Sequence, residues 1–472
     1  MTATHPNARF VEGSTLRHVA VMASTGAVGL IAVFAVDLLN LFYISLLGSK
    51  PTSAAIGFAG AVGFFQTALC IGLTIGVGAT VSRRIGAGDD AGARRIASAS
   101  LAVMLVLTAI VGVVTALLLN PVLDALGAAG PTRDAAAGFL LIASPSLPLL
   151  AGGMVCSALL RSAGDARRAL NVTLYAAIGA AAFDPLFIFG LHLGLTGAAI
   201  STVLSRGVLF AIGLQGARWQ HGLLGRIDIA AMPADLRLVS AVAGPAVLAN
   251  LATPFAGAYV TRSMAVFGPS ALAGQASIDR IAPVAFGLVF ALTGAVGPIL
   301  AQNLGAGRFD RVRATLRDSL LFVIAAVCGA WLVLFLAQDL LVRALSASGE
   351  TAALIRLFCT WLAGSFLFTG TLFVANASFN NLGFPLLATA FNWGRATLGT
   401  IPLVMLGRPY GAVGVMWGQA GGSFVFGIAA VVVAFHVTAR LDRRGPPWRG
   451  AIPLPAAEPP LPPKPEPERA TA

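Results

Sequence analysis

The chain has 472 residues, of which 57% are hydrophobic and only 11% are charged. Soluble globular proteins carry roughly 25% charged residues, so the composition excludes a water-soluble protein and predicts one embedded in a lipid bilayer. The formal net charge is +12, but the basic residues are spread over the segments between apolar runs, so we expect no nucleic-acid partner.

Twelve apolar runs are long enough to be transmembrane helices, which need about 18 or more residues with few charges. They lack the alternation of barrel strands, and open sheets cannot cross lipid, so we predict an all-α integral membrane fold. The predicted spans are residues 18–46, 52–82, 93–119, 133–160, 168–190, 194–217, 238–267, 271–301, 314–338, 351–379, 384–406 and 411–439.

The loops between these spans differ in charge. With the N-terminus in the cytoplasm, the inner loops and both chain ends hold 22 Lys and Arg residues and the outer loops hold five. Cytoplasmic loops of membrane proteins carry the excess of positive charge. We therefore expect a multi-pass protein of the cytoplasmic (inner) membrane with both termini in the cytoplasm.

Three pairs of glycines recur in the same order in the two halves of the chain, at a nearly constant offset. The alternative explanation for these pairs is that short loops between long helices often contain glycine without any repeat. A repeat of six helices, an even number, predicts two six-helix bundles in the same orientation, related by a pseudo-twofold axis along the membrane normal. The pairs are Gly86 and Gly305, Gly164 and Gly383, and Gly197 and Gly414.

The repeat divides the chain into four predicted segments. The N-terminal bundle is 1–217, a cytoplasmic linker is 218–237, and the C-terminal bundle is 238–440. Residues 441–472 contain ten of the 26 prolines, and we predict that they form a disordered cytoplasmic tail.

Two acids and a hydroxyl lie at one depth in the N-terminal bundle. A charge in lipid costs at least about 2.5–3.5 kcal/mol and marks a functional site by default. Counting about 1.5 Å per residue, Asp37, Asp184 and Thr202 lie roughly 10–15 Å below the outer surface. Two neighbouring carboxylates in a low dielectric cannot both ionise cheaply, so they could carry a proton. Asn40, one turn beyond Asp37, could orient that proton or complete an oxygen-ligand site for a cation.

Two questions about this pocket stay open in the sequence. Asp37 and Asp184 could instead satisfy Arg206 or exposed backbone carbonyls. Pro185 removes a backbone donor beside Asp184 and predicts a break in the helix, which fits a static kink as well as a bending joint.

A second set of charges lies in the C-terminal bundle. Asp279 and Arg280 are adjacent, so their side chains point about 100° apart on a helix. Arg262 and Arg395 are then the candidate partners of Asp279. A structural ion network and a second coupling site are both consistent with this set.

Taken together, these features resemble the multidrug and toxic compound extrusion (MATE) family over nearly the whole chain up to about residue 441. The resemblance implies a V-shaped pair of bundles that exports amphipathic, often cationic compounds in exchange for protons or sodium ions. The motifs that carry it are "AVDLLNLFYISLLG", "SRRIGAGDDAGARR", "LRSAGDARRALN", "FDPLFIFGLHLGLTGAAISTV" and "ILAQNLGAGRFDR".

The resemblance also implies roles for particular residues. Asp37 and Asp184 match the acids of the family's N-lobe cation site, and Thr202 matches its hydroxyl. Ala180 stands where the family usually has an asparagine, which removes one oxygen ligand and favours protons over sodium. Gly26 and Gly29 replace a proline that is common near the start of the first span.

Alternative functions are a sodium-coupled drug exporter and a flippase for lipid-linked or polysaccharide precursors. None of the five histidines has an acid or thiol partner at catalytic spacing inside a span, so we expect no enzyme. We also expect no bound cofactor or metal, and a monomer whose partners are the bilayer and a small organic substrate.

Overall fold

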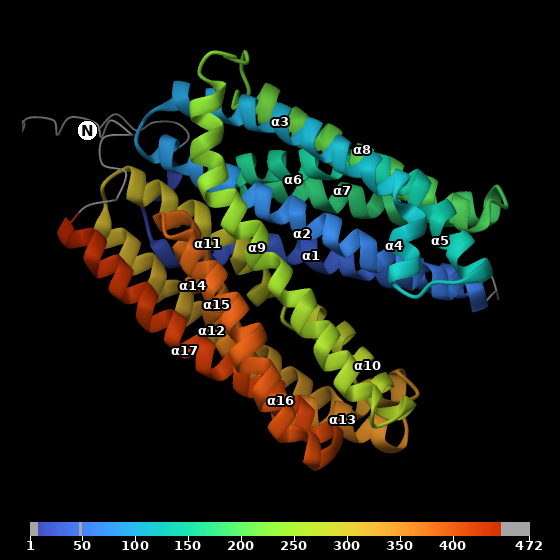
Figure 1. Ribbon diagram of the computed structural model, residues 1–472. Helices are drawn as coiled ribbons and strands as arrows, with labels where there is room; N and C mark the ends of the chain where they lie inside the picture. Colours follow the sequence, from blue (N-terminus) through green and yellow to red (C-terminus); the bar gives the residue numbers. More distant parts are fainter. Residues whose placement is uncertain (1–7, 47–49, 445–472) are drawn as a thin grey trace, which may run out of the picture.

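The computed structural model describes residues 8–46 and 50–444, and these residues are almost entirely helical (Figure 1). Eleven of the described stretches are long and apolar enough to cross a membrane. The last of them, Pro385–Arg443, contains two passes that turn back on each other at Arg408–Tyr410, so twelve crossings result. The predicted all-α fold of twelve transmembrane passes is confirmed.

The described part of the first half forms eight α-helices. A 3-10 turn at Ser144–Ser146 separates α5 from α6, and a π-helical turn at Leu186–Gly190 follows α7. The helices are α1 Thr15–Ser45, α2 Lys50–Gly86, α3 Asp90–Leu117, α4 Leu119–Ala125, α5 Gly130–Ala143, α6 Leu147–Ser162, α7 Ala166–Pro185 and α8 Gly194–Gln215.

In the second half, the described residues form nine α-helices. A 3-10 turn at Leu362–Ser365 separates α13 from α14, and a π-helical turn at Arg395–Thr400 joins α15 to α16. The helices are α9 Met232–Ala265, α10 Pro269–Ala285, α11 Gly287–Gly305, α12 Phe309–Ala344, α13 Gly349–Thr360, α14 Phe366–Leu382, α15 Pro385–Gly394, α16 Ile401–Gly407 and α17 Gly411–Arg444.

Local structure repeats between the halves at the spacing seen in the sequence. Helix α5 begins at Gly130 and α13 at Gly349, and each is followed by a break and a second helix, α6 or α14, that begins at the same offset. Gly164 and Gly383, again at this offset, both have positive φ, at 75° and 90°, in the turn that follows. Only glycine adopts this conformation without steric cost, so the repeated glycines mark repeated turns.

The boundaries differ from the predicted segments at two places. Helix α9 begins at Met232, inside the predicted linker 218–237. Pro233 suits the first turn of a helix, and the carboxylate of Asp235 in that turn pairs with Arg95 of α3 at 2.7 and 3.0 Å. Helix α17 runs to Arg444, and residues 445–472, most of the predicted tail, lie outside the described residues.

The two halves form a V (Figure 1). They lie together at the end that carries the turns 87–89, 163–165 and 306–308, and they diverge toward α5 in one half and α13 in the other. We call the first end, with its arginine-rich loops, the basic end.

At the basic end the two repeats touch through equivalent residues. A Cβ added to Gly86 would overlap the main chain of Gln302, and one added to Gly305 would overlap the carbonyl of Arg83. Arg83 and Gln302 are separated by the same offset as Gly86 and Gly305. The same contact is therefore made twice, as a twofold-related interface requires, and glycine is needed because the backbones meet directly.

Hydrogen bonds from the N-terminal segment 8–14 reinforce this closure. The carboxamide of Gln302 accepts from the backbone N–H of Phe10 at 3.0 Å and donates to the carbonyl of Ser162 at 2.6 Å. The guanidinium of Arg311 donates to three carbonyls of the same segment at 2.8 to 3.0 Å. Phe10 is 2% exposed, so the basic end is closed by packed and hydrogen-bonded chain.

We expect Gly305→Ala to weaken the closure, because the added methyl has no room against the Arg83 carbonyl. Overpacking of this kind costs about 1–3 kcal/mol. The purified variant should melt at a lower temperature, and amides around residues 83–88 and 302–307 should exchange hydrogen faster. Gly329→Ala on the exposed side of α12, where an added Cβ meets nothing within 4 Å, is the control. Equal exchange rates in both variants would contradict the contact.

Candidate functional site

Helices α1 and α7 pack together and bring three of the predicted residues into one place. Asp184 is the penultimate residue of α7 and only 2% exposed. Its Oδ2 accepts a hydrogen bond from Nδ2 of Asn40 on α1 at 2.9 Å. Asp37, one turn earlier on α1, is exposed, and its carboxyl group interacts electrostatically with that of Asp184. The carboxyl groups of Asp37 and Asp184 and the amide of Asn40 thus lie where α1 packs against α7.

Pro185 determines where α7 ends as a regular helix. Proline has no N–H to donate and its ring crowds the preceding turn. The chain continues as the π-helical turn Leu186–Gly190, closed by a bond from Leu191 N to Leu186 O at 2.9 Å. Wider turns of this kind recur at functional sites. Asp184 therefore lies at the junction between the regular helix and the wider turn.

Thr202 lies on α8 but does not bond to either carboxylate. Its hydroxyl donates to the carbonyl of Ala198 in its own helix at 2.9 Å, so only its lone pairs remain for another ligand. Within residues 8–46 and 50–444, no group of three or more His, Cys, Asp or Glu side chains is placed to hold a metal ion.

Arg206 has a partner other than the acids. Its Nη1 donates to the carbonyl of Ala143 at 2.8 Å and to Oγ of Ser146 at 2.9 Å. Both partners belong to the break between α5 and α6, where backbone carbonyls lose their helical donors. Arg206 thus stabilises that break.

The four charged residues singled out in the second half do not form a cluster in the described structure. Asp279 accepts from Nε2 of Gln275, one turn away on α10, at 2.9 Å. Arg262 and Arg280 are exposed, and Nε of Arg395 is buried with no hydrogen-bond partner. In the described part of the chain no ion pair joins Asp279 to an arginine.

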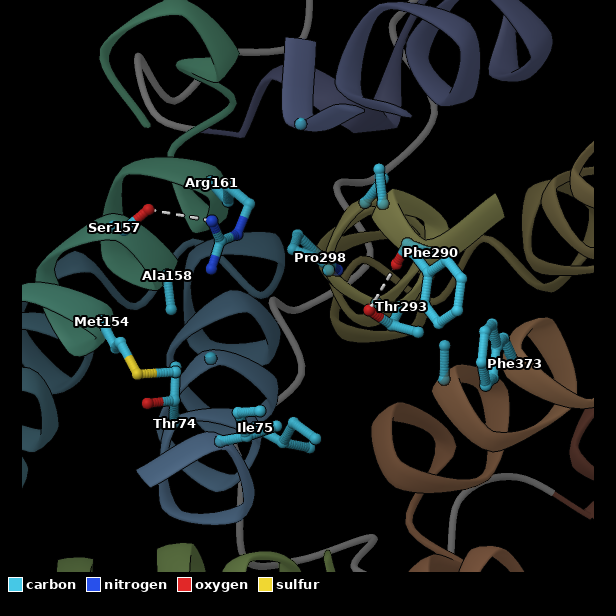
Figure 2. A pocket seen from close by; sticks show the side chains of 18 of the residues that line it. Thr74, Ile75, Met154, Ser157, Ala158, Arg161, Phe290, Thr293, Pro298 and Phe373 are labelled. Atoms are coloured by element: carbon cyan, nitrogen blue, oxygen red, sulfur yellow. Dashed lines mark hydrogen bonds between the residues drawn. The ribbon is translucent and has the colours of Figure 1, made fainter. Parts of the chain in front are cut away.

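A cavity of about 510 Å³ lies between the two halves, lined mainly by α1, α2, α6, α7, α11 and α14 (Figure 2). Pockets for drug-sized ligands measure about 300–1,000 Å³. Leu30 lines the cavity, and Asp37 lies seven residues further along the same helix, which is about 10 Å at 1.5 Å per residue. The carboxylate site and the cavity therefore share α1 and α7 but occupy different depths.

The charge in this cavity was not predicted from the sequence. Arg161 was expected among the arginines of the inner loops, but the structure places it in the last turn of α6 with its side chain lining the cavity. Long basic side chains at helix ends can extend along apolar surface, and the position of Arg161 directly after the apolar run 133–160 was the available signal. Asn376 and Asn380, four residues apart on α14, also line the cavity and were missed because they are uncharged.

We expect Arg206→Gln to lower the melting temperature without changing how transport depends on the ion gradient. A hydrogen bond to a charged group contributes about 1.5–3 kcal/mol, and the shorter side chain would lose the bonds to Ala143 and Ser146. Arg280→Gln, on an exposed arginine of α10, is the matched control and should melt like the unmodified chain. Loss of ion dependence in a folded Arg206→Gln variant would instead assign Arg206 to the carboxylate site.

Comparison with known proteins identifies relatives along most of the chain. A FAD transporter of Shewanella oneidensis is 28% identical over 425 residues, covering 88% of this chain and 90% of that protein. A probable multidrug resistance protein of Pseudomonas aeruginosa, NorM, is 30% identical, with 83% of each chain covered.

Solved structures show the same fold. A MATE transporter of Vibrio cholerae, VcmN, superposes with a TM-score of 0.85 over 90% of this chain and 97% of that one, at 24% identity. An outward-facing multidrug resistance MATE transporter superposes with a TM-score of 0.84 over 92% of this chain and 98% of that one, at 19% identity. The MatE family model matches residues 27–186 and 245–406, more than half of the chain. The chain therefore belongs to the MATE family and is a membrane transporter, not an enzyme.

Proposed function

We propose that the chain is a secondary active antiporter that exports small amphipathic organic compounds in exchange for protons. The observation that carries this proposal is the Asp37–Asn40–Asp184 arrangement on two helices that also line the cavity. A buried carboxylate beside a second carboxylate can hold a proton reversibly, because two neighbouring negative charges repel each other. A proton bound there changes the contact between α1 and α7, and through these helices the shape of the cavity.

In this proposal the basic end faces the cytoplasm, as the distribution of arginines favours. The closed basic end and the divergence of α5 from α13 then correspond to an outward-open state (Figure 1). The amide of Asn40 donates to Asp184, which suits the ionised carboxylate. Protonation from outside weakens that bond, and the two halves then move as units to open the basic end.

The small number of side-chain oxygen atoms around Asp184 favours protons over sodium ions as the coupling ion. Ala180 offers no side-chain oxygen where a sodium ion would need one more ligand. A proton needs one carboxylate oxygen, whereas a bound sodium ion needs several ligands. The flippase alternative predicts a strongly basic cavity, but Arg206, Arg262, Arg280 and Arg395 do not line the cavity described.

The class of compound is argued from the relatives and the cavity together. Relatives carry names as different as FAD transporter and multidrug resistance protein, and both names refer to organic molecules rather than inorganic ions. The cavity is lined mainly by apolar side chains with a few polar ones. We therefore propose small amphipathic compounds as the substrate class.

We expect Asp37→Asn to abolish proton-driven transport, because the amide of asparagine does not take up and release a proton at the pH of the assay. Inside-out vesicles containing the full chain would be given a proton gradient and a panel of fluorescent compounds that includes ethidium and flavin mononucleotide. Asp184→Asn should shift the pH dependence of the same transport. Asp279→Asn, an acid of the second half outside the site, is the matched control and should transport normally.

Two results would overturn the coupling assignment. One is full proton-driven transport by Asp37→Asn vesicles that contain as much protein as the unmodified ones. The other is transport driven by a sodium gradient at equal pH on both sides, which would restore the sodium alternative.

A further inference from the structure

The cavity between the halves carries one charge, and it is positive. Among its described lining residues Arg161 is the only charged side chain, and no aspartate or glutamate lines it. Nη1 of Arg161 donates to Oγ of Ser157 at 2.9 Å, and no carboxylate of the described chain forms an ion pair with it. A guanidinium in an apolar cavity without a counterion is costly, so its retention there favours a function.

The guanidinium is placed to reach a ligand. Figure 2 shows Arg161 extending from α6 toward the space that Thr74 of α2 and Pro298 of α11 also line. A Cβ added to Gly294 of α11 would lie 3.5 Å from Nε of Arg161, so the side chain sits where the two halves meet. Arginine has five N–H donors in a planar fork, and a neutral hydroxyl occupies one of them here. The others match the paired oxygens of a carboxylate or phosphate.

A buried hydroxyl that lines the same cavity also lacks a partner in the described chain. Oγ1 of Thr74 is buried without a hydrogen bond in the described chain, and Thr74 lines the same side of the cavity as Met154 and Arg161 (Figure 2). Buried polar groups in native proteins are almost always hydrogen-bonded. A ligand that fills the cavity could offer Thr74 a second polar group while Arg161 binds the first.

The opposite side of the cavity suits a flat ring with polar edges. The rings of Phe290 and Phe373 lie 5.4 Å apart between centroids and are tilted by 50°, and both line the cavity. Asn376 and Asn380 of α14 each have a buried side-chain oxygen without a hydrogen-bond partner. Aromatic faces beside unsatisfied amides favour a heteroaromatic ring that carries donors and acceptors at its edge.

We propose that this cavity binds aromatic organic anions, with Arg161 binding a carboxylate or phosphate group and the α11–α14 side binding the ring. The assignment rests on the proposed export function and specifies its substrate class. It replaces the cationic class implied by the family resemblance, because a cation would enter a cavity that contains a guanidinium and no described carboxylate. Asn376 and Asn380 are then the residues that select the ring.

The test is equilibrium binding to the purified full chain in lipid nanodiscs, with matched pairs of probes that differ in one anionic group. The pairs are flavin mononucleotide with riboflavin and 2-naphthoate with 2-naphthylmethanol, followed by fluorescence anisotropy. We expect the anion to bind at least about tenfold tighter in one or both pairs, the ratio that one charge-assisted hydrogen bond supplies. Added salt should reduce that ratio.

The arginine is tested with three variants. Arg161→Gln should remove the preference for the anion and leave binding of the neutral partner nearly unchanged. Arg161→Lys should keep part of it, because lysine retains the charge but not the fork. Arg226→Gln, an exposed arginine of the loop before α9, should bind like the unmodified chain. Melting temperatures show which variants are folded, and the comparison of probe pairs on the unmodified chain needs no variant.

Equal affinity for charged and neutral probes in both pairs, or no binding of any probe, would overturn the proposal. So would a preference for the anion that survives in folded Arg161→Gln. Binding at equilibrium needs no ion gradient, so it is separable from antiport. Asp37-dependent export without a preference for anions would refute this inference alone, and a preference for anions without Asp37-dependent export would refute the antiport alone.

Discussion

The reciprocal contact at the basic end sets how the two halves of the chain are arranged. Gly86 meets Gln302 and Gly305 meets Arg83, so equivalent residues of the two repeats touch across the pseudo-twofold axis. Because the halves are joined there and diverge toward α5 and α13, a cavity opens between α2, α6, α11 and α14. A larger residue than glycine at either contact would hold the backbones apart. The cavity and the closed end are therefore two consequences of one interface.

The mechanism that we propose depends on two helices that reach both sites. Helices α1 and α7 carry the hydrogen bond between Asn40 and Asp184 at one depth and line the cavity at another. Our proposals put opposite charges on these two sites, with carboxylates that exchange protons and an arginine that binds an anion. Separation along the helices keeps Arg161 from neutralising the acids directly. A proton taken up at Asp37 or Asp184 could then change how α1 packs without a direct contact with substrate.

The sequence could place Asp37 and Asp184 at one depth because depth in a membrane is a simple count along a helix. Asp37 and Asp184 fall at the same level of two spans, and the structure brings them together with Asn40. Depth along a helix does not show which neighbouring group each polar side chain bonds to. Arg206 was a candidate partner for the acids, yet it bonds the carbonyl exposed at the break after α5. The same limit applies to Asp279, which accepts from Gln275 in its own helix.

The all-helical membrane fold, its twelve passes and the repeated glycine turns could be predicted from the amino-acid sequence. They follow from run lengths, apolar composition and backbone conformation, which are local properties. The folded chain was needed to see that Arg161 lines the cavity and that Gly86 and Gly305 meet the opposite repeat. The direction of a long side chain at a helix end, and the approach of two backbones from opposite halves of the chain, depend on how whole helices pack. No pattern within one span contains that information.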